Sequence, residues 1–191
     1  HTAAYDSPAT EKPAGFGRPI GDPALPKMTA DGTAVFGEAV AMVADALGVE
    51  LDAIVCEAEY AQAVTDIDLG SWRIDAGGVA GIAASWQGRV GDRTVVELSF
   101  RWKKGFGLDP DWQIEDGHVI EVQGRPTVIA KLQFLPPPDF QAQTMSDFMV
   151  LGHIMTAMPA INAIPLVVAA PPGIVTYADL PLPLPRGLVR L

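Results

Sequence analysis

The sequence predicts an α+β domain in which a mostly antiparallel (mixed) sheet of about five or six strands is packed on one face by helices. Three observations lead to this prediction: an amphipathic helical segment at residues 33–47, strand-like alternation between residues 54 and 135, and a second helical region from about residue 143. Helices before and after a run of hairpin-connected strands are typical of a sheet covered by helices.

The first helix is predicted from Thr33 to Leu47. Its apolar residues recur at spacings of four, three and four, at Phe36, Val40, Val43 and Leu47. This spacing places them on one face of a helix with 3.6 residues per turn. Asp31 or Thr33 can cap the start, and Gly48 is placed to end the helix.

Strands are predicted at residues 54–69, 79–90 and 94–104, the last two joined by a tight hairpin at Gly91-Asp92. The third strand alternates with period two: Val96, Leu98, Phe100 and Trp102 point one way, and Glu97, Ser99, Arg101 and Lys103 point the other way. One face of the sheet is therefore expected to be packed and the other wet. A second hairpin is predicted from His118–Val122 and Thr127–Leu135.

A run of thirty-one residues, 148–178, contains no Asp, Glu, Lys or Arg. This run exceeds the roughly 20 residues that a bilayer helix needs, so it is either a membrane span or the buried spine of a domain. We expect the spine, because Pro159, Pro165, Pro171 and Pro172 each remove a backbone donor and so forbid an unbroken helix of 18 residues. Asp147 and Asp179, rather than Lys or Arg, also flank the run. The prediction is a helix over 143–158, broken or kinked at Pro159, and a second apolar segment over 160–170.

The domain organisation predicted is an arm, residues 1–32, followed by an α+β substrate-binding and dimerisation domain, residues 33–191. Five prolines and four glycines forbid long regular elements in the arm. The arm is either a mobile linker or a segment pinned to a surface by its large apolar residues, which are Tyr5, Phe16, Ile20 and Leu25.

Composition excludes several classes of protein. The net charge of -10, from 13 basic and 23 acidic residues, argues against a nucleic-acid surface. Cys56 is the single cysteine, so it closes no internal disulfide, and a cytoplasmic location is expected. The spacing of the three histidines fits no metal site, and no metal is expected. Gly77, Gly78 and Gly81 precede strand-like residues rather than a helix, so they predict no phosphate loop.

Some polar and aromatic residues are candidates for a ligand site. His153 and Asn162 lie in the uncharged run, where a buried polar group needs either an internal hydrogen-bond partner or a ligand. Thr176 and Tyr177 follow a Pro-Pro-Gly turn, which either simply packs or lines a pocket. The four tryptophans, at positions 72, 86, 102 and 112, are expected in the core or at an interface between subunits.

The segment AMPAINAIPLVVAAPPGIVTYADLP, residues 157–181, resembles the C-terminal signature of the dihydrodipicolinate reductase-like proteins. That group includes 2,4-diaminopentanoate dehydrogenase and the NAD(P)H-dependent amine dehydrogenases. The order of predicted elements from Thr33 to Pro185 is also similar to the order in their C-terminal domain, so a dihydrodipicolinate reductase C-terminal-like fold is expected.

The resemblance implies a substrate-binding and dimerising part of an NAD- or NADP-dependent oxidoreductase acting on amines or ketones. The cofactor would be bound mainly by an N-terminal Rossmann half that these residues lack, and the sheet would form a homodimer. By resemblance, Asn162 lies near the cofactor amide, and Trp72, His153, Thr176 and Tyr177 line the substrate pocket. The catalytic acid would lie on the other half. The alternative is a non-enzymatic binding module for a small apolar ligand or a protein partner.

At the other end of the chain, His1 and the segment Asp6-Ser7-Pro8-Ala9-Thr10 resemble the histidine and DxPSGT stretch of true dihydrodipicolinate reductases. The glycine of that motif is missing, and Ala4 stands where those enzymes place a lysine. Dihydrodipicolinate reduction is therefore not expected.

Overall fold

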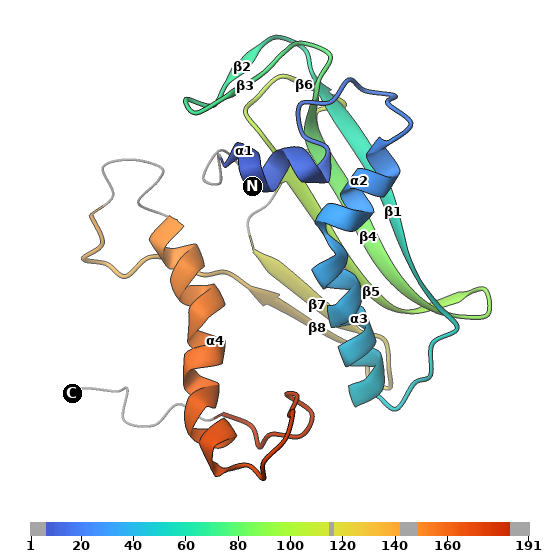
Figure 1. Cartoon of the computed structure of the whole chain (residues 1–191), viewed down its shortest axis with the longest axis vertical. Coiled ribbons are helices and arrows are strands. Elements are labelled where there is room, and N and C mark those ends of the chain that lie inside the picture. The colour runs from blue at the N-terminus through green and yellow to red at the C-terminus, as the bar shows by residue number, and fades with distance from the viewer. Residues whose placement is uncertain (1–6, 115–116, 142–148, 184–191) are drawn as a thin grey trace. The chain divides into compact units, whose positions relative to one another are not determined.

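The computed structural model describes residues 7–114, 117–141 and 149–183 (Figure 1). The chain forms two compact units, residues 1–135 and residues 136–191, called here the N-terminal and C-terminal units, and each is described by itself.

The N-terminal unit begins with three short helical elements and one longer helix. These are α1 (Pro8–Glu11), η1 (Lys12–Ala14), α2 (Leu25–Gly32) and α3 (Ala34–Ala46). Its strands are β1 (Ala53–Ala63), β2 (Ile67–Asp68), β3 (Arg73–Ile74), β4 (Val79–Val90), β5 (Arg93–Lys103), β6 (Leu108–Asp109), β7 (His118–Val122) and β8 (Val128–Leu132). The C-terminal unit contains α4 (Met149–Ala169).

The predicted α+β class is confirmed. The main sheet has four antiparallel strands in the order β5-β4-β1-β6, and two further ribbons pair β2 with β3 and β7 with β8. The helix predicted at residues 33–47 is α3, and both predicted hairpins are present as β4–β5 and β7–β8. The strand predicted over 54–69 ends at Ala63, and the chain then forms the separate strand β2.

Helices α2 and α3 cover one face of the four-stranded sheet, as Figure 1 shows. The core beneath them contains Leu25, Val40, Ile82 and Ala84, each no more than 4% exposed. Trp86 of β4 also points to this side, and its indole Nε1 donates to Thr33 Oγ1 at 3.0 Å. Burial of these apolar side chains is the main force that holds the helices on the sheet.

The segment predicted as an irregular arm is fastened to the main sheet. Pro8, Pro13 and Pro26 lie in the first turns of α1, η1 and α2, where the missing N–H costs no helical hydrogen bond. Gly17 N donates to Val79 O, and Val79 N donates to Arg18 O, both at 2.8 Å. Of the two alternatives for the arm, a mobile linker or a segment pinned by its large apolar residues, the structure shows pinning by two of those four residues.

Those two are Phe16 and Leu25, each 2% exposed, whereas Ile20 is 39% exposed and Tyr5 lies outside the described residues. A buried ion pair adds to the attachment, because Lys104 Nζ, directly after β5, contacts Glu11 Oε1 of α1. The predicted division of the chain between residues 32 and 33 stays a prediction.

The helix of the C-terminal unit corrects a prediction. Helix α4 runs for 21 residues and includes Pro159 and Pro165, so the argument that these prolines forbid an unbroken helix of 18 residues was wrong. A proline removes one backbone donor and crowds the carbonyl four residues earlier, which costs about 3 kcal/mol but does not by itself end a helix. The part of the prediction over residues 143–148 lies outside the described residues.

The expected burial of this helix is not observed either. Its segment Leu151–Ala169 is the single helix in the described part of the chain that is long and apolar enough to cross a bilayer, with a mean hydropathy of 1.5. Several large apolar side chains on it are at least half exposed: Ile154, Ile161, Ile164 and Val168. Length and hydropathy alone do not separate a membrane span from a core helix of a soluble protein.

We predict that Gly37→Ala destabilises the protein by about 1–2 kcal/mol, although alanine favours a helix more than glycine does. A Cβ at position 37 would lie 2.7 Å from Trp86 Cζ3, and Trp86 cannot move away easily because it is 9% exposed and hydrogen bonded to Thr33. Urea denaturation of the variant and the parent measures the change.

Glu38→Ala is the matched control, because Glu38 is exposed on the same helix α3. This control introduces an alanine into α3 without a steric clash against Trp86. It is expected to change the free energy of unfolding by less than about 0.5 kcal/mol. If Gly37→Ala were as stable as the parent, α3 would not pack on Trp86 as described.

Candidate functional site

The face of the main sheet that α2 and α3 leave open carries a set of polar side chains from three strands. Strand pairing places Glu57 of β1 opposite Ser85 of β4, and Ser85 opposite Ser99 of β5. In the next row, Gln87 of β4 lies opposite Glu97 of β5. Because side chains alternate along a strand, these residues share the face opposite to Trp86.

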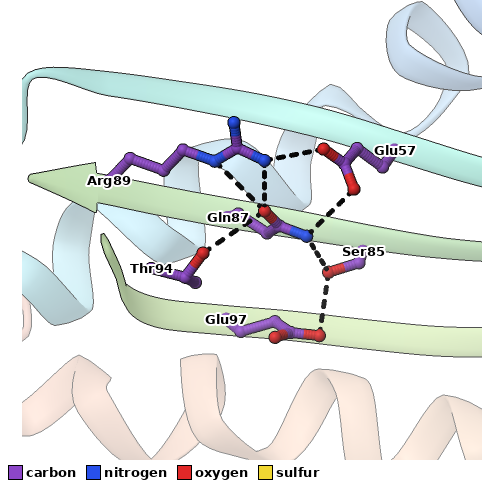
Figure 2. Close-up of polar contacts among 6 residues, drawn as sticks. All are labelled: Glu57, Ser85, Gln87, Arg89, Thr94 and Glu97. Atoms are coloured by element: carbon purple, nitrogen blue, oxygen red, sulfur yellow. Dashed lines mark hydrogen bonds and ion pairs between the residues drawn. The ribbon is translucent and has the colours of Figure 1, made fainter. Parts of the chain in front are cut away.

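A hydrogen-bond network joins six residues of this face (Figure 2). Arg89 Nη2 donates to Glu57 Oε1 at 2.6 Å and to Gln87 Oε1 at 2.7 Å. Gln87 Nε2 donates to Ser85 Oγ at 3.2 Å and to Glu57 Oε2 at 3.4 Å. The network reaches β5 through Ser85 Oγ, which donates to Glu97 Oε1 at 2.8 Å, and through Thr94 Oγ1, which donates to Gln87 Oε1 at 3.3 Å.

A shallow depression of about 650 Å³ lies on the same face. Its floor is made of small residues, including Ala83, Ser85 and Ser99, and charged residues border it, including Glu59 and Arg101. It contains no histidine or cysteine. No group of three or more His, Cys, Asp or Glu among the described residues could hold a metal ion. The titratable side chains of the depression are three glutamates, Glu57, Glu59 and Glu97, and one arginine, Arg101.

Trp72, predicted as a pocket residue, packs inside the N-terminal unit. It lies just before β3 and is partly buried against both core clusters of this unit. Lys12 Nζ lies 5.3 Å from the centre of its ring. Its indole Nε1 is buried and has no hydrogen-bond partner in the part of the chain that the structure describes. Its role as a pocket residue stays a prediction.

His153 and Asn162, the other two candidates of the uncharged run, are both exposed on α4. They are nine residues apart, which corresponds to two and a half helical turns, so they lie on opposite sides of the helix and roughly 13 Å apart along its axis. The helix does not bring them together on one surface. The reasoning that both are buried polar groups in need of partners does not hold in this unit, because their side chains are open to solvent.

Thr176 and Tyr177 lie in the segment that follows α4, and both are exposed. Here the loop is closed by Asp179, whose Oδ2 accepts hydrogen bonds of 2.8 Å from the backbone N and from Oγ1 of Thr176. The backbone N–H and then the hydroxyl of Thr176 lower the pKa of Asp179 below its ordinary value. These bonds orient Thr176 toward Asp179.

The other residues singled out in the sequence lie at the turn before β4 and at the start of the chain. Gly77 and Gly78 form the turn that leads into β4, and Gly77 has φ +81°, so this turn precedes a strand and not a helix. His1, Ala4 and Asp6 lie outside the described residues. The polar face of Figure 2 was missed by sequence reasoning, although the alternation of Glu97, Ser99 and Arg101 already indicated a wet face.

The fold and this face define an α+β domain with one helix-covered and one open sheet surface, and comparisons with known proteins place it in a family. The family model described as "2,4-diaminopentanoate dehydrogenase C-terminal domain" matches residues 24–189. The chain therefore belongs to the family of 2,4-diaminopentanoate dehydrogenase C-terminal domains.

Two known proteins are similar to the chain. The 2,4-diaminopentanoate dehydrogenase of Acetoanaerobium sticklandii is 28% identical over 151 residues, which cover 78% of this chain and 37% of that protein. The structure of an amine dehydrogenase from Mycobacterium smegmatis has a TM-score of 0.56 and 19% identity, covering 93% of this chain and 47% of that one. The second likeness shows the fold alone, and the chain spans less than half of either relative.

We predict that Thr176→Val raises the pKa of Asp179 part of the way to its ordinary value, because one of its two hydrogen bonds is lost while the backbone N–H remains. NMR titration of the Asp179 carboxyl carbon measures this change. Since the folded pKa is lowered, the stabilising contact is present above the ordinary pKa of an aspartate and is lost as pH falls through the folded value.

Thr127→Val is the control for this titration, because Thr127 is exposed and its hydroxyl contacts a backbone carbonyl, that of Gly124, rather than a carboxylate. It is expected to leave the Asp179 titration unchanged. An equal pKa for Asp179 in the parent and in Thr176→Val would contradict the described loop.

Proposed function

We propose that this chain is the substrate-binding and dimerising part of an NAD(P)-dependent oxidoreductase that acts on amines or ketones, by reductive amination or oxidative deamination. The observation that carries the proposal is the family match over residues 24–189. The name of the Acetoanaerobium sticklandii relative, 2,4-diaminopentanoate dehydrogenase, supports the same direction.

The nicotinamide cofactor, NAD or NADP, is proposed to bind mainly to a Rossmann half outside these residues. Dinucleotide sites need a glycine-rich turn that opens a helix, so that helical N–H groups meet the pyrophosphate. The described residues do not fit this requirement, because the Gly77-Gly78 turn leads into strand β4. The chain spans 37% and 47% of its two relatives, which leaves room in such proteins for a second half.

The pocket roles are proposed for residues in both units. Asn162 is the candidate for contact with the cofactor amide, and Trp72, His153, Thr176 and Tyr177 are the candidates for the substrate pocket. Since His153 and Asn162 lie on opposite sides of α4, the proposal is that each faces a different neighbour. No residue of this chain is assigned as the catalytic acid or base.

The proposed partners are a small amine or ketone and a second copy of the chain bound through the sheet, in a cytoplasmic protein. The acidic net charge of -10 supports the exclusion of nucleic acid. We also propose that the protein does not act in a membrane. The alternative of an apolar ligand on the sheet is not favoured, because the open face carries charged and hydrogen-bonding groups.

We predict that this chain alone binds NADPH and NADH with no detectable heat at micromolar concentration in isothermal titration calorimetry. The physical reason is that the described residues provide no glycine-rich helix start for the pyrophosphate. The positive control is the product of the complete reading frame that contains these residues, which is expected to bind at least one of the two cofactors. Micromolar binding by the chain alone would contradict the division of roles.

A further inference from the structure

We infer that the outer edge of strand β1 is a docking site for an extended segment of another protein, in which basic and aliphatic residues alternate. The segment adds to the main sheet as one more strand beside β1. This inference goes beyond the proposed enzymatic role and does not depend on it. Three features of β1 carry it: an unpaired backbone edge, a surrounding charge of one sign and an apolar groove at the start of the strand.

The first feature is the unpaired edge. Within the described residues, β1 pairs with β4 over residues 53–62 on one side, whereas on the other side it pairs with β6 at Gln62 and Ala63 alone (Figure 1). Backbone N–H and C=O groups point alternately to the two sides of an antiparallel strand, so part of those in residues 53–61 face outward. Such a row, roughly 30 Å long at the usual rise per residue, is a template for another strand.

Strand β1 lacks two features that commonly protect such an edge. Lysine and proline are frequent on protected edges, and neither occurs in residues 53–61. The register shift in the pairing with β4 comes after Ala61, so the strand is regular before it. At the opposite edge of the sheet, β5 carries positive charge at Arg93, Arg101 and Lys103. The two edges therefore differ in charge, and the edge of β1 is the one that admits a basic strand.

The second feature is the charge of the surrounding sequence. Residues 28–72, which include α3 and β1, contain nine Asp and Glu residues and no Lys or Arg. This leaves 14 of the 23 acidic residues and all 13 basic ones for the rest of the chain, so nearly the whole net charge of -10 belongs to this stretch. A surface with charge of one sign attracts a partner of the opposite sign and repels one of the same sign.

On β1 itself the acidic side chains lie on the open face, at Glu57 and Glu59. Glu57 pairs with Arg89 and is partly neutralised. Glu59 is exposed and makes no hydrogen bond or ion pair with another described residue. Side chains of an added strand on this face would lie beside the two carboxylates, roughly 5 Å away between Cβ atoms. Opposite charges in cross-strand positions stabilise pairing, so the open-face side of the added strand is expected to be basic.

The third feature is an apolar groove of about 510 Å³ at the start of β1. It lies between the end of α3, the loop that follows and the first residues of the strand. Most of its lining is apolar and includes Val49, Leu51 and Ile54, whereas Asp45 and Asp52 add two carboxylates. The groove therefore suits an aliphatic side chain that has a basic neighbour.

The groove lies on the helix side of β1. Cys56 is opposite Trp86, which points toward the helices, so Ile54 points to the same side by alternation. Farther along the strand, Ala58 and Tyr60 pack partly against the core on this side. An added strand would meet these apolar side chains with every second residue, which favours aliphatic residues at those positions. Backbone hydrogen bonds would supply the pairing and the alternation would supply the selectivity.

The test is an NMR titration of the ¹⁵N-labelled 191-residue chain with the synthetic peptide acetyl-KVKVKVK-amide. We expect saturable binding at peptide concentrations below about 1 mM, with the largest shifts at the amides of residues 53–61. Outward-facing amides of this edge are also expected to exchange more slowly with D₂O in the complex, because they gain hydrogen-bond acceptors.

Two control peptides separate strand addition from simple attraction of charge. Acetyl-EVEVEVE-amide has the same alternation with the opposite charge and is expected not to bind. Acetyl-KVKPKVK-amide keeps the basic residues, but its proline removes a backbone donor in the middle of the strand. It is expected to bind at least about tenfold more weakly than the parent peptide.

Two protein variants test the position of the site. Glu59→Lys is expected to weaken binding of acetyl-KVKVKVK-amide by roughly three- to tenfold, because it places like charges in cross-strand positions. Glu38→Lys makes the same change in net charge at an exposed position on α3 and is expected to change binding by less than about twofold. The thermal midpoint verifies that both variants are folded.

Equal binding of the proline peptide and the parent peptide would overturn the inference, because it would show attraction of charge without strand pairing. Shifts centred on β5 or on the middle of the open face, or no binding of the lysine peptide at about 1 mM, would overturn it as well. Concentration-dependent shifts of residues 53–61 without peptide would assign the edge to a second copy instead. The oxidoreductase role is tested separately by cofactor titration, so none of these outcomes decides it.

Discussion

The close approach of helix α3 to strand β4 is the contact on which the rest of the N-terminal unit depends. Gly37 of α3 gives the ring of Trp86 room, and Gly88 of β4 gives room to Val40 and Leu51, since a Cβ at either glycine would lie under 3 Å from these side chains. The hydrogen bond from Trp86 to Thr33 fixes the start of the same helix. Because α3 packs directly on β4, the side chains of β4 that face the helices are buried.

Because α2 and α3 cover one face of the sheet, the side chains that alternate with the covered ones must lie on the open face. Strand residues alternate, so the residues that follow Ile82, Ala84 and Trp86 must point away from the helices. They are Ala83, Ser85 and Gln87. Part of the charge on that side is neutralised within the chain by the network of Figure 2. Glu59 and Arg101 lie on the same side, and neither makes a hydrogen bond or ion pair with another described residue.

Much of this arrangement could be predicted from periodicity, because helix α3 and strand β5 each carry a clear apolar repeat. The six-residue network of the open face could not be predicted as a group, since its residues come from three strands and depend on pairing register. Helix α2 was missed because Pro26 was taken as a breaker, although a proline in the first turn of a helix is favourable. Helix α4 continues through Pro159 and Pro165. The local sequence does not tell how much destabilisation by proline a 21-residue helix can tolerate before it breaks. The candidate pocket residues came from a family resemblance and not from spacing. Composition alone placed Trp72 in the core or at an interface, and the structure shows it partly buried against both core clusters.

The family match is to a C-terminal domain, and the central claim is that this chain serves an enzyme that exchanges hydride between a nicotinamide cofactor and an amine or ketone. The most direct measurement follows NADPH and NADH absorbance in the complete reading-frame product, with a set of small ketones and ammonium. The account predicts cofactor oxidation that requires both the ketone and ammonium. Oxidation that does not depend on ammonium, or a complete protein that turns over neither cofactor with any ketone or amine, would contradict it.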